Sequence, residues 1–331
     1  MKLVTFEMGK RPRLGVVENE NVWSVDGIVA MLRARKAPKA IAEKSRFKQA
    51  ARVLLDAGTP RDMIELLERG AAWRRALGAV TSALAREIDP ARMSKGRKSG
   101  GAGGPFATPL AEAKLLAPIA RPGKITCVGL NYADHAREQG IEPPDRPIFF
   151  LKSNNTICGP GDPITLPPNS SQVDYEAEFA VVLGKRGRRI AEEKAMDYVA
   201  GYTVLHDVTA RDMQFADNQW FRGKSCDTFA PTGPWIVTPD DIPDINSLRI
   251  SLSLNGETLQ DSNTSNLIFK VPYLISYLSQ SLTWEPGDLL STGTPPGVGV
   301  FRKPPVFLKA GDSVSVTVEG VGTLANPVVG S

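Results

Sequence analysis

Histidine and cysteine, on which much enzyme chemistry depends, are scarce in this chain of 331 residues. The only histidines are His135 and His206, and no Gly-x-Ser-x-Gly segment is present to supply an exposed nucleophilic serine. The cysteines, Cys127, Cys158 and Cys226, are odd in number and widely spaced. This excludes a disulfide framework and a zinc site of closely paired cysteines.

Long apolar runs are also missing. No uninterrupted apolar stretch approaches the thickness of a bilayer, and the segment 1–7 has no apolar signal core behind a basic start. We therefore expect a cytoplasmic protein that does not cross a membrane. Hydrophobic residues make up 42% and charged residues 23%, which is typical of globular proteins, and the length favours about two domains.

The net charge of +4 hides an asymmetry. Residues 1–120 carry 22 lysines and arginines against 12 acidic residues, whereas residues 121–331 carry 18 against 24. These basic residues are spread through helical segments without interleaved aromatics, which favours a solvated face and no nucleic-acid partner. The alternative is a binding module whose basic N-terminal region contacts nucleic acid or an acidic partner.

The first part of the chain has the patterns of a small α+β domain. Residues 2–26 alternate apolar and polar and predict an antiparallel meander. Apolar residues at helical spacing over 27–87, interrupted by Gly58-Thr59-Pro60, predict two or three helices. Residues 94–108 are rich in glycine and lysine, which indicates a linker or a mobile loop.

After Leu115 the chain changes to short β-type runs separated by glycine, proline, asparagine and aspartate. Short helices are expected near 132–139, 191–199, 208–217 and 270–280. The pattern favours an α+β fold, mainly β, with a mixed β-sandwich or roll. We predict domains at 1–93 and 112–331, joined by 94–111. The expected strands are Lys124–Val128, Phe179–Leu183, Tyr202–His206, Trp235–Val237, Arg249–Leu254 and Ser313–Val318.

An acidic pair, Glu176 and Glu178, is the first candidate for a site. On a strand, period-two geometry puts both carboxylates on one face, about 7 Å apart, where a divalent cation relieves their repulsion. A solvent-facing strand with alternating glutamates is the alternative. Asp207, at the end of a predicted strand, is a third acid. Oxygen ligands alone favour Mg²⁺ or Mn²⁺, with Ca²⁺ as a further alternative.

His135 and Glu138 are neighbours at i and i+3 on the predicted helix near 132–139. A carboxylate in this position orients an imidazole and raises its basicity, which gives a general base. A surface ion pair is the alternative. The loop 293–300 lacks the Lys-Ser/Thr pair of a phosphate-binding loop. We interpret it as a tight β-connection that points backbone amides or Thr294 at a ligand.

Taken together, these segments resemble the fumarylacetoacetate hydrolase family over residues 112–329. The resemblance rests on six separated motifs in register. They are Cys127-Val128-Gly129-Leu130-Asn131-Tyr132-Ala133-Asp134-His135, Phe150-Leu151-Lys152, Asp174-Tyr175-Glu176-Ala177-Glu178, the segment from Gly201-Tyr202 to Arg211-Asp212-Met213-Gln214, Gly223-Lys224-Ser225-Cys226-Asp227, and Ser291-Thr292-Gly293-Thr294-Pro295-Pro296-Gly297-Val298-Gly299.

The resemblance implies a mixed β-roll catalytic domain, a homodimer and a Mg²⁺ site. It implies that the metal ligands are Glu176, Glu178 and Asp207, that His135, Glu138 and Lys224 are catalytic, and that Tyr132, Lys152, Arg211, Gln214 and Thr294 surround the substrate. One position departs from the family pattern. The founding hydrolase has a further aspartate ligand near the position of Val128, and we expect a water molecule in its place. The N-terminal region resembles an accessory domain of part of the family.

The activity expected from this resemblance is metal-dependent hydrolysis of a carbon–carbon bond in a 2,4-dioxo acid. His135 would activate water, and pyruvate and a carboxylic acid would be released, while cations such as Lys224 and Arg211 stabilise the enolate. The alternative is an oxaloacetate-type decarboxylase, or an isomerase or lyase that acts on a 2-oxo acid through a metal-bound enolate.

Overall fold

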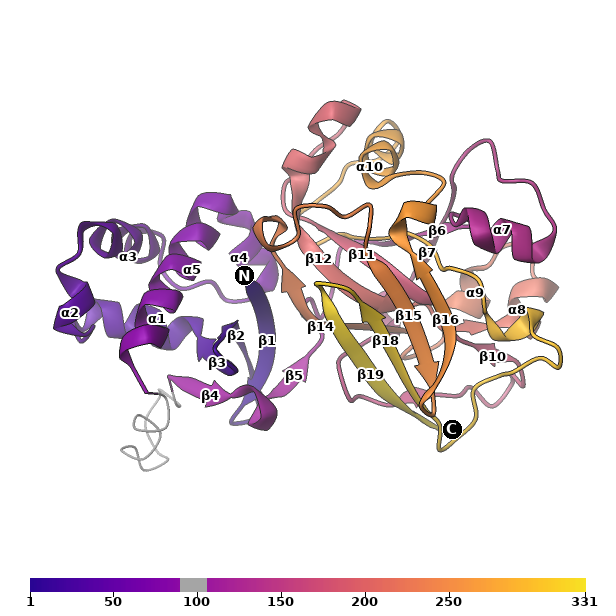
Figure 1. Cartoon of the computed structure of the whole chain (residues 1–331), viewed down its shortest axis with the longest axis horizontal. Helices are drawn as coiled ribbons and strands as arrows, with labels where there is room; N and C mark the ends of the chain where they lie inside the picture. The colour runs from indigo at the N-terminus through magenta and orange to yellow at the C-terminus, as the bar shows by residue number, and fades with distance from the viewer. Residues whose placement is uncertain (90–105) are drawn as a thin grey trace. The chain divides into compact units, whose positions relative to one another are not determined.

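The computed structural model describes residues 1–89 and 106–331, which form two compact units, Met1–Pro118 and Ile119–Ser331 (Figure 1). Each unit buries its own set of hydrophobic side chains. The domain limits 1–93, 94–111 and 112–331 stay a prediction. Most of the expected linker, residues 94–105, lies outside the described residues.

The first unit contains the antiparallel meander that was predicted from residues 2–26. Its strands are connected by two two-residue turns, which are Gly9-Lys10 and Asn19-Glu20. All four turn residues have positive φ. This backbone conformation matches the right-handed twist of a hairpin. The strands are β1 (Lys2–Met8), β2 (Arg11–Glu18) and β3 (Asn21–Ser24), with β4 (Ala107–Pro109) paired to β3 and β5 (Lys114–Leu116) paired to β1.

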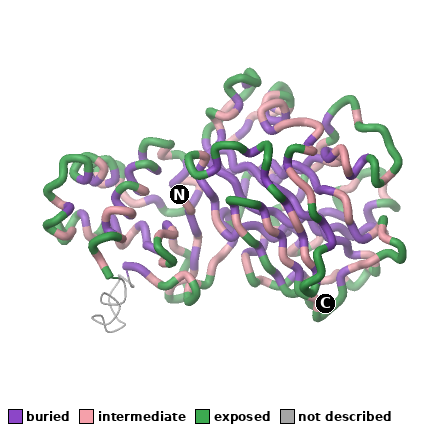
Figure 2. Tube along the Cα trace, in the orientation of Figure 1, coloured by how far each residue is buried: buried purple, intermediate pink, exposed green. Residues whose placement is uncertain are grey.

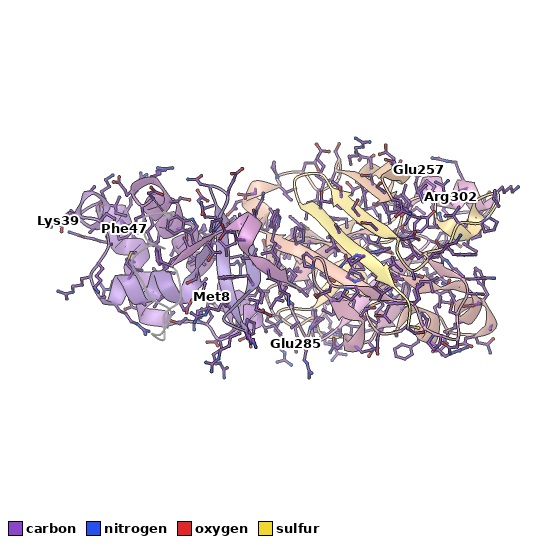
Figure 3. All side chains as sticks on the ribbon, turned by 90° about the horizontal axis from the view of Figure 1, so that it is seen from below. Met8, Lys39, Phe47, Glu257, Glu285 and Arg302 are labelled. Atoms are coloured by element: carbon purple, nitrogen blue, oxygen red, sulfur yellow. The ribbon has the colours of Figure 1, made fainter. Side chains whose placement is uncertain are left out.

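Five α-helices, rather than two or three, lie within residues 25–87 of this unit. Pro38 precedes the second, and Gly58 and Gly70, both with positive φ, separate the later ones. Figure 3 labels two residues of these helices: Lys39 is exposed, whereas Phe47 is buried. The helices are α1 (Val25–Arg33), α2 (Lys39–Ala42), α3 (Ser45–Ala57), α4 (Met63–Glu68) and α5 (Gly70–Glu87).

The main sheet of the second unit is mixed, with the order β14-β12-β11-β17-β6-β7. Its neighbours pair antiparallel except β17 and β6, which are parallel, and β8 (Ile157–Cys158) adds a parallel pairing to β14. The strands are β6 (Ile125–Gly129), β7 (Ile148–Lys152), β11 (Ala177–Leu183), β12 (Val199–His206), β14 (Ala230–Val237) and β17 (Leu289–Ser291).

A second sheet of order β16-β15-β18-β19-β9 packs on the first, and a two-stranded ribbon joins β10 to β13. Strands β15 and β18 alternate buried and partly exposed residues, whereas every residue of β11 is buried. The strands are β9 (Ile164–Thr165), β10 (Val173–Asp174), β13 (Thr209–Ala210), β15 (Arg249–Leu254), β16 (Glu257–Asn263), β18 (Ser313–Val318) and β19 (Gly322–Val329).

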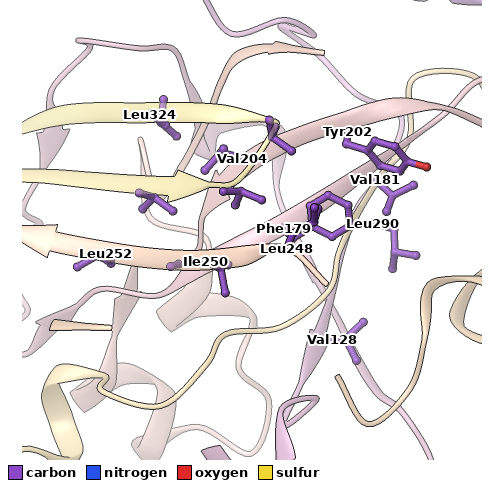
Figure 4. Packing of buried hydrophobic residues seen from close by; sticks show 14 of the residues in the cluster. Val128, Phe179, Val181, Tyr202, Val204, Leu248, Ile250, Leu252, Leu290 and Leu324 are labelled. Carbon is purple, nitrogen blue, oxygen red and sulfur yellow. The ribbon is translucent and has the colours of Figure 1, made fainter. Parts of the chain in front are cut away.

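The core of this unit lies between the two sheets. Figure 4 shows Phe179 and Val204 on one side and Ile250 and Leu324 on the other, and all four are fully buried. Figure 2 shows that the strands consist mainly of buried residues, whereas the peripheral loops consist mainly of exposed ones. The α+β fold with a mixed sandwich is therefore confirmed.

Short helices occur in the second unit at the four expected places: α7 (Ala133–Gln139), α8 (Arg211–Ala216), α10 (Val271–Ser279) and a 3₁₀ helix at Glu192–Tyr198. A further short helix, α9 (Phe221–Lys224), was not expected. Shorter 3₁₀ turns span Leu110–Glu112, Asn154–Thr156, Pro239–Asp241, Thr264–Asn266 and Gly299–Phe301. None of the helices in the described residues is long and apolar enough to cross a membrane.

The sandwich core predicts a large stability cost for Phe179→Ala. Phe179 is fully buried and its ring centroid lies 5.3 Å from that of Tyr202, so truncation leaves a cavity and should lower the free energy of unfolding by about 3–5 kcal/mol. Urea denaturation measures this. The control Val329→Ala truncates a side chain of β19 that is 38% exposed, and it should change the free energy by about 0.5 kcal/mol or less. Equal losses in the two variants would contradict the packing described.

Candidate active site

The acidic pair Glu176 and Glu178 lies at the start of β11. The chain leaves β10 at Asp174, passes through Glu176 without strand pairing and enters β11 at Ala177. Glu176 is 5% exposed and Glu178 is 1% exposed. The alternative of a solvent-facing strand is therefore excluded, because both residues are buried.

Asp207 lies beside Glu176 and Glu178 because β11 and β12 are antiparallel neighbours. Their register pairs Ala177 with His206, and the amide of Asp207 donates a hydrogen bond to the carbonyl of Glu176 at 2.9 Å. Carboxylate oxygens of Glu176, Glu178 and Asp207 lie within 4.8 Å of one another. Three buried carboxylates at this spacing repel one another unless cations lie among them.

Two lysines supply part of the compensating charge. The ammonium of Lys224 donates to Glu176 at 2.6 Å and to Asp207 at 2.8 Å, and it lies 4.9 Å from the ring centroid of Phe150. The ammonium of Lys152 donates to the other oxygen of Asp207 at 2.5 Å. Asp207 is thus held by two ammonium groups, and Glu176 by one.

Arg211, at the start of α8, supplies a third cation and links Glu176 to Asp174. Its guanidinium donates to Asp174 at 2.8 Å, to Glu176 at 2.5 Å and to the amide oxygen of Gln214 at 2.9 Å. Asp174 also accepts from the amide of Gly299 at 2.7 Å. A side chain at residue 299 would collide with Asp174, so glycine is required for this approach.

Glu178 differs from the other acids because it forms no ion pair with a lysine or arginine of the described residues. It accepts hydrogen bonds from the hydroxyl of Ser291 and from the amide of Gly293. Burial raises the pKa of Glu178 well above its usual value, and the charges of Asp207 and Glu176 add to this rise. Burial also raises the pKa of Glu176, but Lys224 and Arg211 outweigh burial and lower it to about 2.

With all four carboxylates ionised, the cluster would carry one negative charge more than its cations balance. Four buried carboxylates face three buried cations, Lys152, Lys224 and Arg211. An oxygen-only set of three close carboxylates, one of which has no cationic partner, fits a hard divalent cation. Such an ion would be held by Glu176, Glu178 and Asp207. Val128, near the position where the family resemblance implies a further aspartate ligand, offers no oxygen ligand in its side chain.

His135 lies on α7 with both ring nitrogens engaged. Its Nδ1 is 2.9 Å from a carboxylate oxygen of Glu138, and its Nε2 is 2.8 Å from the amide nitrogen of Gln139. The other oxygen of Glu138 accepts from the amide of Gly297 at 2.9 Å. His135 is buried, so this pair is not an ordinary surface ion pair.

A cavity of about 130 Å³ brings most of the expected site residues together. Those that line it are His135, Glu176, Glu178, Arg211, Gln214, Lys224 and Thr294. Apolar walls come from Val128, Phe150, Phe215, Trp220 and Phe301. The cavity thus presents an imidazole, carboxylates and two cations to one small volume.

Tyr132, Lys152, Glu138 and Asp207 do not line this cavity. Tyr132 is fully buried, and Lys152 is directed at Asp207 and the carbonyl of Val208. A direct substrate contact by Tyr132 or Lys152 therefore stays a prediction. His206 is buried beside Asp207, and burial lowers its pKa to about 3, which keeps the ring neutral.

Comparisons with known proteins show the family of this chain. The family model "Fumarylacetoacetate (FAA) hydrolase C-terminal" matches residues 124–329. The chain belongs to the fumarylacetoacetate hydrolase family. It is similar over its full length to the solved fumarylacetoacetate hydrolase from Exiguobacterium antarcticum, with 32% identity, a TM-score of 0.75 and coverage of 100% of both chains. As a member of this superfamily it is an enzyme that acts on small molecules.

Curated relatives are similar at higher identity. The mitochondrial oxaloacetate tautomerase FAHD2A of Bos taurus is 48% identical over 82% of this chain and 80% of its own length. The mitochondrial oxaloacetate tautomerase of Xenopus laevis is 54% identical over 65% of this chain and 68% of its own length. The names of both relatives place them in mitochondria, and this contradicts the cytoplasmic location expected from the sequence.

Three residues of the site were not identified from the sequence. Asp174 continues the period-two spacing of Glu176 and Glu178, so this spacing could have indicated it. Gln139 follows His135 by four residues on a predicted helix, where i+4 neighbours meet. Ser291 reaches Glu178 only because β17 pairs with β11, and no local pattern in the sequence signals that pairing.

The raised pKa of Glu178 predicts a metal affinity that depends on pH. Below that pKa the carboxyl holds a proton that a divalent ion must displace, so affinity should fall by up to about tenfold for each pH unit of acidification. Calorimetric titration with Mn²⁺ in two buffers of different ionisation enthalpy measures the released proton. Metal binding without proton release below the pKa would contradict this assignment. The control variant Glu257→Gln changes an exposed acid on β16. It should bind Mn²⁺ and release protons as the unaltered protein does.

Proposed function

We propose that this protein is a divalent-metal-dependent keto–enol tautomerase for a small 2-oxo dicarboxylic acid of the oxaloacetate type. The observation that carries the proposal is a buried histidine, bonded through Nδ1 to the carboxylate of Glu138, in the wall of a small cavity that also presents carboxylates and cations. The relatives named as oxaloacetate tautomerases support it. A cavity of about 130 Å³ favours a compact substrate.

The reaction needs only proton transfer. In enolisation a proton leaves C3, the electron pair of the C3–H bond becomes the second bond of C2=C3, and the oxygen on C2 takes up a proton. Atoms and charge balance without water or a redox partner. The enzyme therefore needs a base near C3 and positive charge near the oxygen on C2.

His135 would be the base. A proton on Nδ1, donated to Glu138, leaves Nε2 free of a proton and able to accept one from C3. The carboxylate of Glu138 then stabilises the imidazolium, and its bond from the amide of Gly297 keeps it in position. In ketonisation His135 returns the proton to C3.

Lys224 and Arg211 would stabilise the charge that develops on the oxygen, because both line the cavity. A divalent ion held by the three close carboxylates would supply Lewis acidity that polarises the 2-oxo group. With all four carboxylates ionised, it would bring the net charge of the cluster to about +1, which favours an anionic substrate. We propose Mg²⁺, with Mn²⁺ or Ca²⁺ as alternatives, and Glu176, Glu178 and Asp207 as its ligands.

Carbon–carbon hydrolysis, the activity expected first, is supported less well than the alternative that includes isomerases. The curated relatives reported above carry tautomerase names. Hydrolysis also requires His135 to activate a water molecule, which tautomerisation does not. Decarboxylation needs no such base, so the loss of His135 separates decarboxylation from tautomerisation.

We also propose a homodimer, without a nucleic-acid or membrane partner. The edge strand β7 exposes Ile148 and Leu151, and the neighbouring helices α8 and α9 expose Phe215 and Phe221. Large exposed apolar side chains around a sheet edge favour coverage by another protein surface.

The proposal predicts that His135→Asn lowers kcat for tautomerisation by about 10²–10⁴-fold, which is the usual contribution of a general base. KM should change little, because the cations and carboxylates remain. The ultraviolet absorbance of the enol follows the reaction, and pyruvate is measured in the same samples to detect decarboxylation. An unchanged kcat in a variant that still binds Mn²⁺ would refute the role of His135.

A further inference from the structure

The ring of His135 is bonded on both sides by residues of its own helix. Glu138 and Gln139 follow it by three and four residues and reach Nδ1 and Nε2 respectively. An amide nitrogen can only donate a hydrogen bond, so Nε2 of His135 must accept. The ring proton therefore lies on Nδ1, which donates to the carboxylate of Glu138.

Helix α7, which carries these residues, is anchored at both ends. The carboxylate of Asp134 accepts from the hydroxyl of Ser262 at 2.5 Å and from the amide of Asn266 at 3.0 Å. At the other end Glu138 accepts from the amide of Gly297, and Gly140 ends the helix in the left-handed conformation. Gln139 is thus the last helical residue, and it lines the cavity together with His135.

The position of Gln139 has a chemical consequence. The lone pair on Nε2 is the one that must take a proton from a substrate or from water, and the amide of Gln139 occupies it in this structure. A bound substrate and a water molecule differ in their ability to displace the amide of Gln139 from Nε2. A bound carbon acid fixed by cations can present its C3–H at Nε2, whereas a water molecule must compete for the lone pair without such anchoring.

We propose that Gln139 is a positioning residue that selects the reaction: it holds His135 in the Nδ1–H form and shields Nε2 from water, which favours proton exchange with the substrate over hydrolysis. This inference rests on the proposed tautomerase function. It adds to that function a residue that sets its specificity.

The decisive variant is Gln139→Met, which keeps the length of the side chain and removes the donor. Loss of donation to Nε2 destabilises the neutral ring, so the acidic limb of the pH profile of kcat/KM should move up by about 0.5–1 pH unit. Gln139→Glu should move the limb further, because a carboxylate stabilises the imidazolium. The charged groups facing His135 stay the same in Gln139→Met: Glu138 on its own helix, and Glu176, Glu178, Arg211 and Lys224 in the cavity.

A second readout is the choice between reactions. With a 2,4-dioxo acid as probe, the ratio of hydrolysis to tautomerisation should rise about fivefold in Gln139→Met, the factor that one hydrogen bond of ordinary strength represents. The matched control is Gln280→Met, because Gln280 is exposed at the end of α10. The control should leave both the pH profile and the ratio unchanged. An unchanged profile and ratio in Gln139→Met would overturn the proposal.

Nuclear magnetic resonance of ¹⁵N-histidine separates this inference from the proposed function, since it reads the ring without any activity. The chain has only two histidines, so the spectrum contains two ring systems, and His135→Asn assigns them. We expect the proton of His135 to lie on Nδ1, and we expect the Nε2 resonance to shift in Gln139→Met, because that nitrogen loses its hydrogen bond while Glu138 still accepts from Nδ1. A proton on Nε2 in the unaltered protein would overturn the inference even if tautomerisation is confirmed.

Discussion

The site depends on an unequal balance of buried charge. Asp174, Glu176, Glu178 and Asp207 are all buried, and three cations lie among them. Burying an unpaired carboxylate is unfavourable and raises its pKa, as it does for Glu178, so a protein that needed only stability would not keep this residue there. In the proposed function this carboxylate is a ligand of the divalent ion, and the ion in turn would attract an anionic substrate.

The fold places these charges by means of strand register and two anchored connections. The antiparallel pairing of β11 with β12 brings Asp207 to Glu176, and the pairing of β11 with β17 brings Ser291 to Glu178. The loop 293–300 then donates backbone amides to Glu178, Glu138 and Asp174. One loop therefore links the acidic cluster to the helix that carries His135. The interpretation of this loop as a source of backbone amides agrees with these bonds, although their acceptors are protein carboxylates.

The sequence was informative where local patterns determine the structure. Period-two alternation located most strands, helical spacing located α7, and family motifs brought together His135, Glu176 and Lys224. The sequence was less informative where partners are distant along the chain. The ion pair of Lys152 with Asp207 spans 55 residues, and burial of both faces of β11 depends on the second sheet. Strand spacing alone could not distinguish a buried acidic pair from a solvated one.

Thermal unfolding of Glu178→Gln with and without a divalent cation tests the central claim most directly. Removal of the unpaired carboxyl should raise the midpoint of thermal unfolding of the metal-free protein. The hydrogen bonds from Ser291 and Gly293 are kept, because an amide oxygen can still accept them. The same variant should lose the increase in the midpoint that Mg²⁺ or Mn²⁺ gives the unaltered protein. A variant that is less stable without metal, yet keeps the full metal-induced increase, would contradict the account.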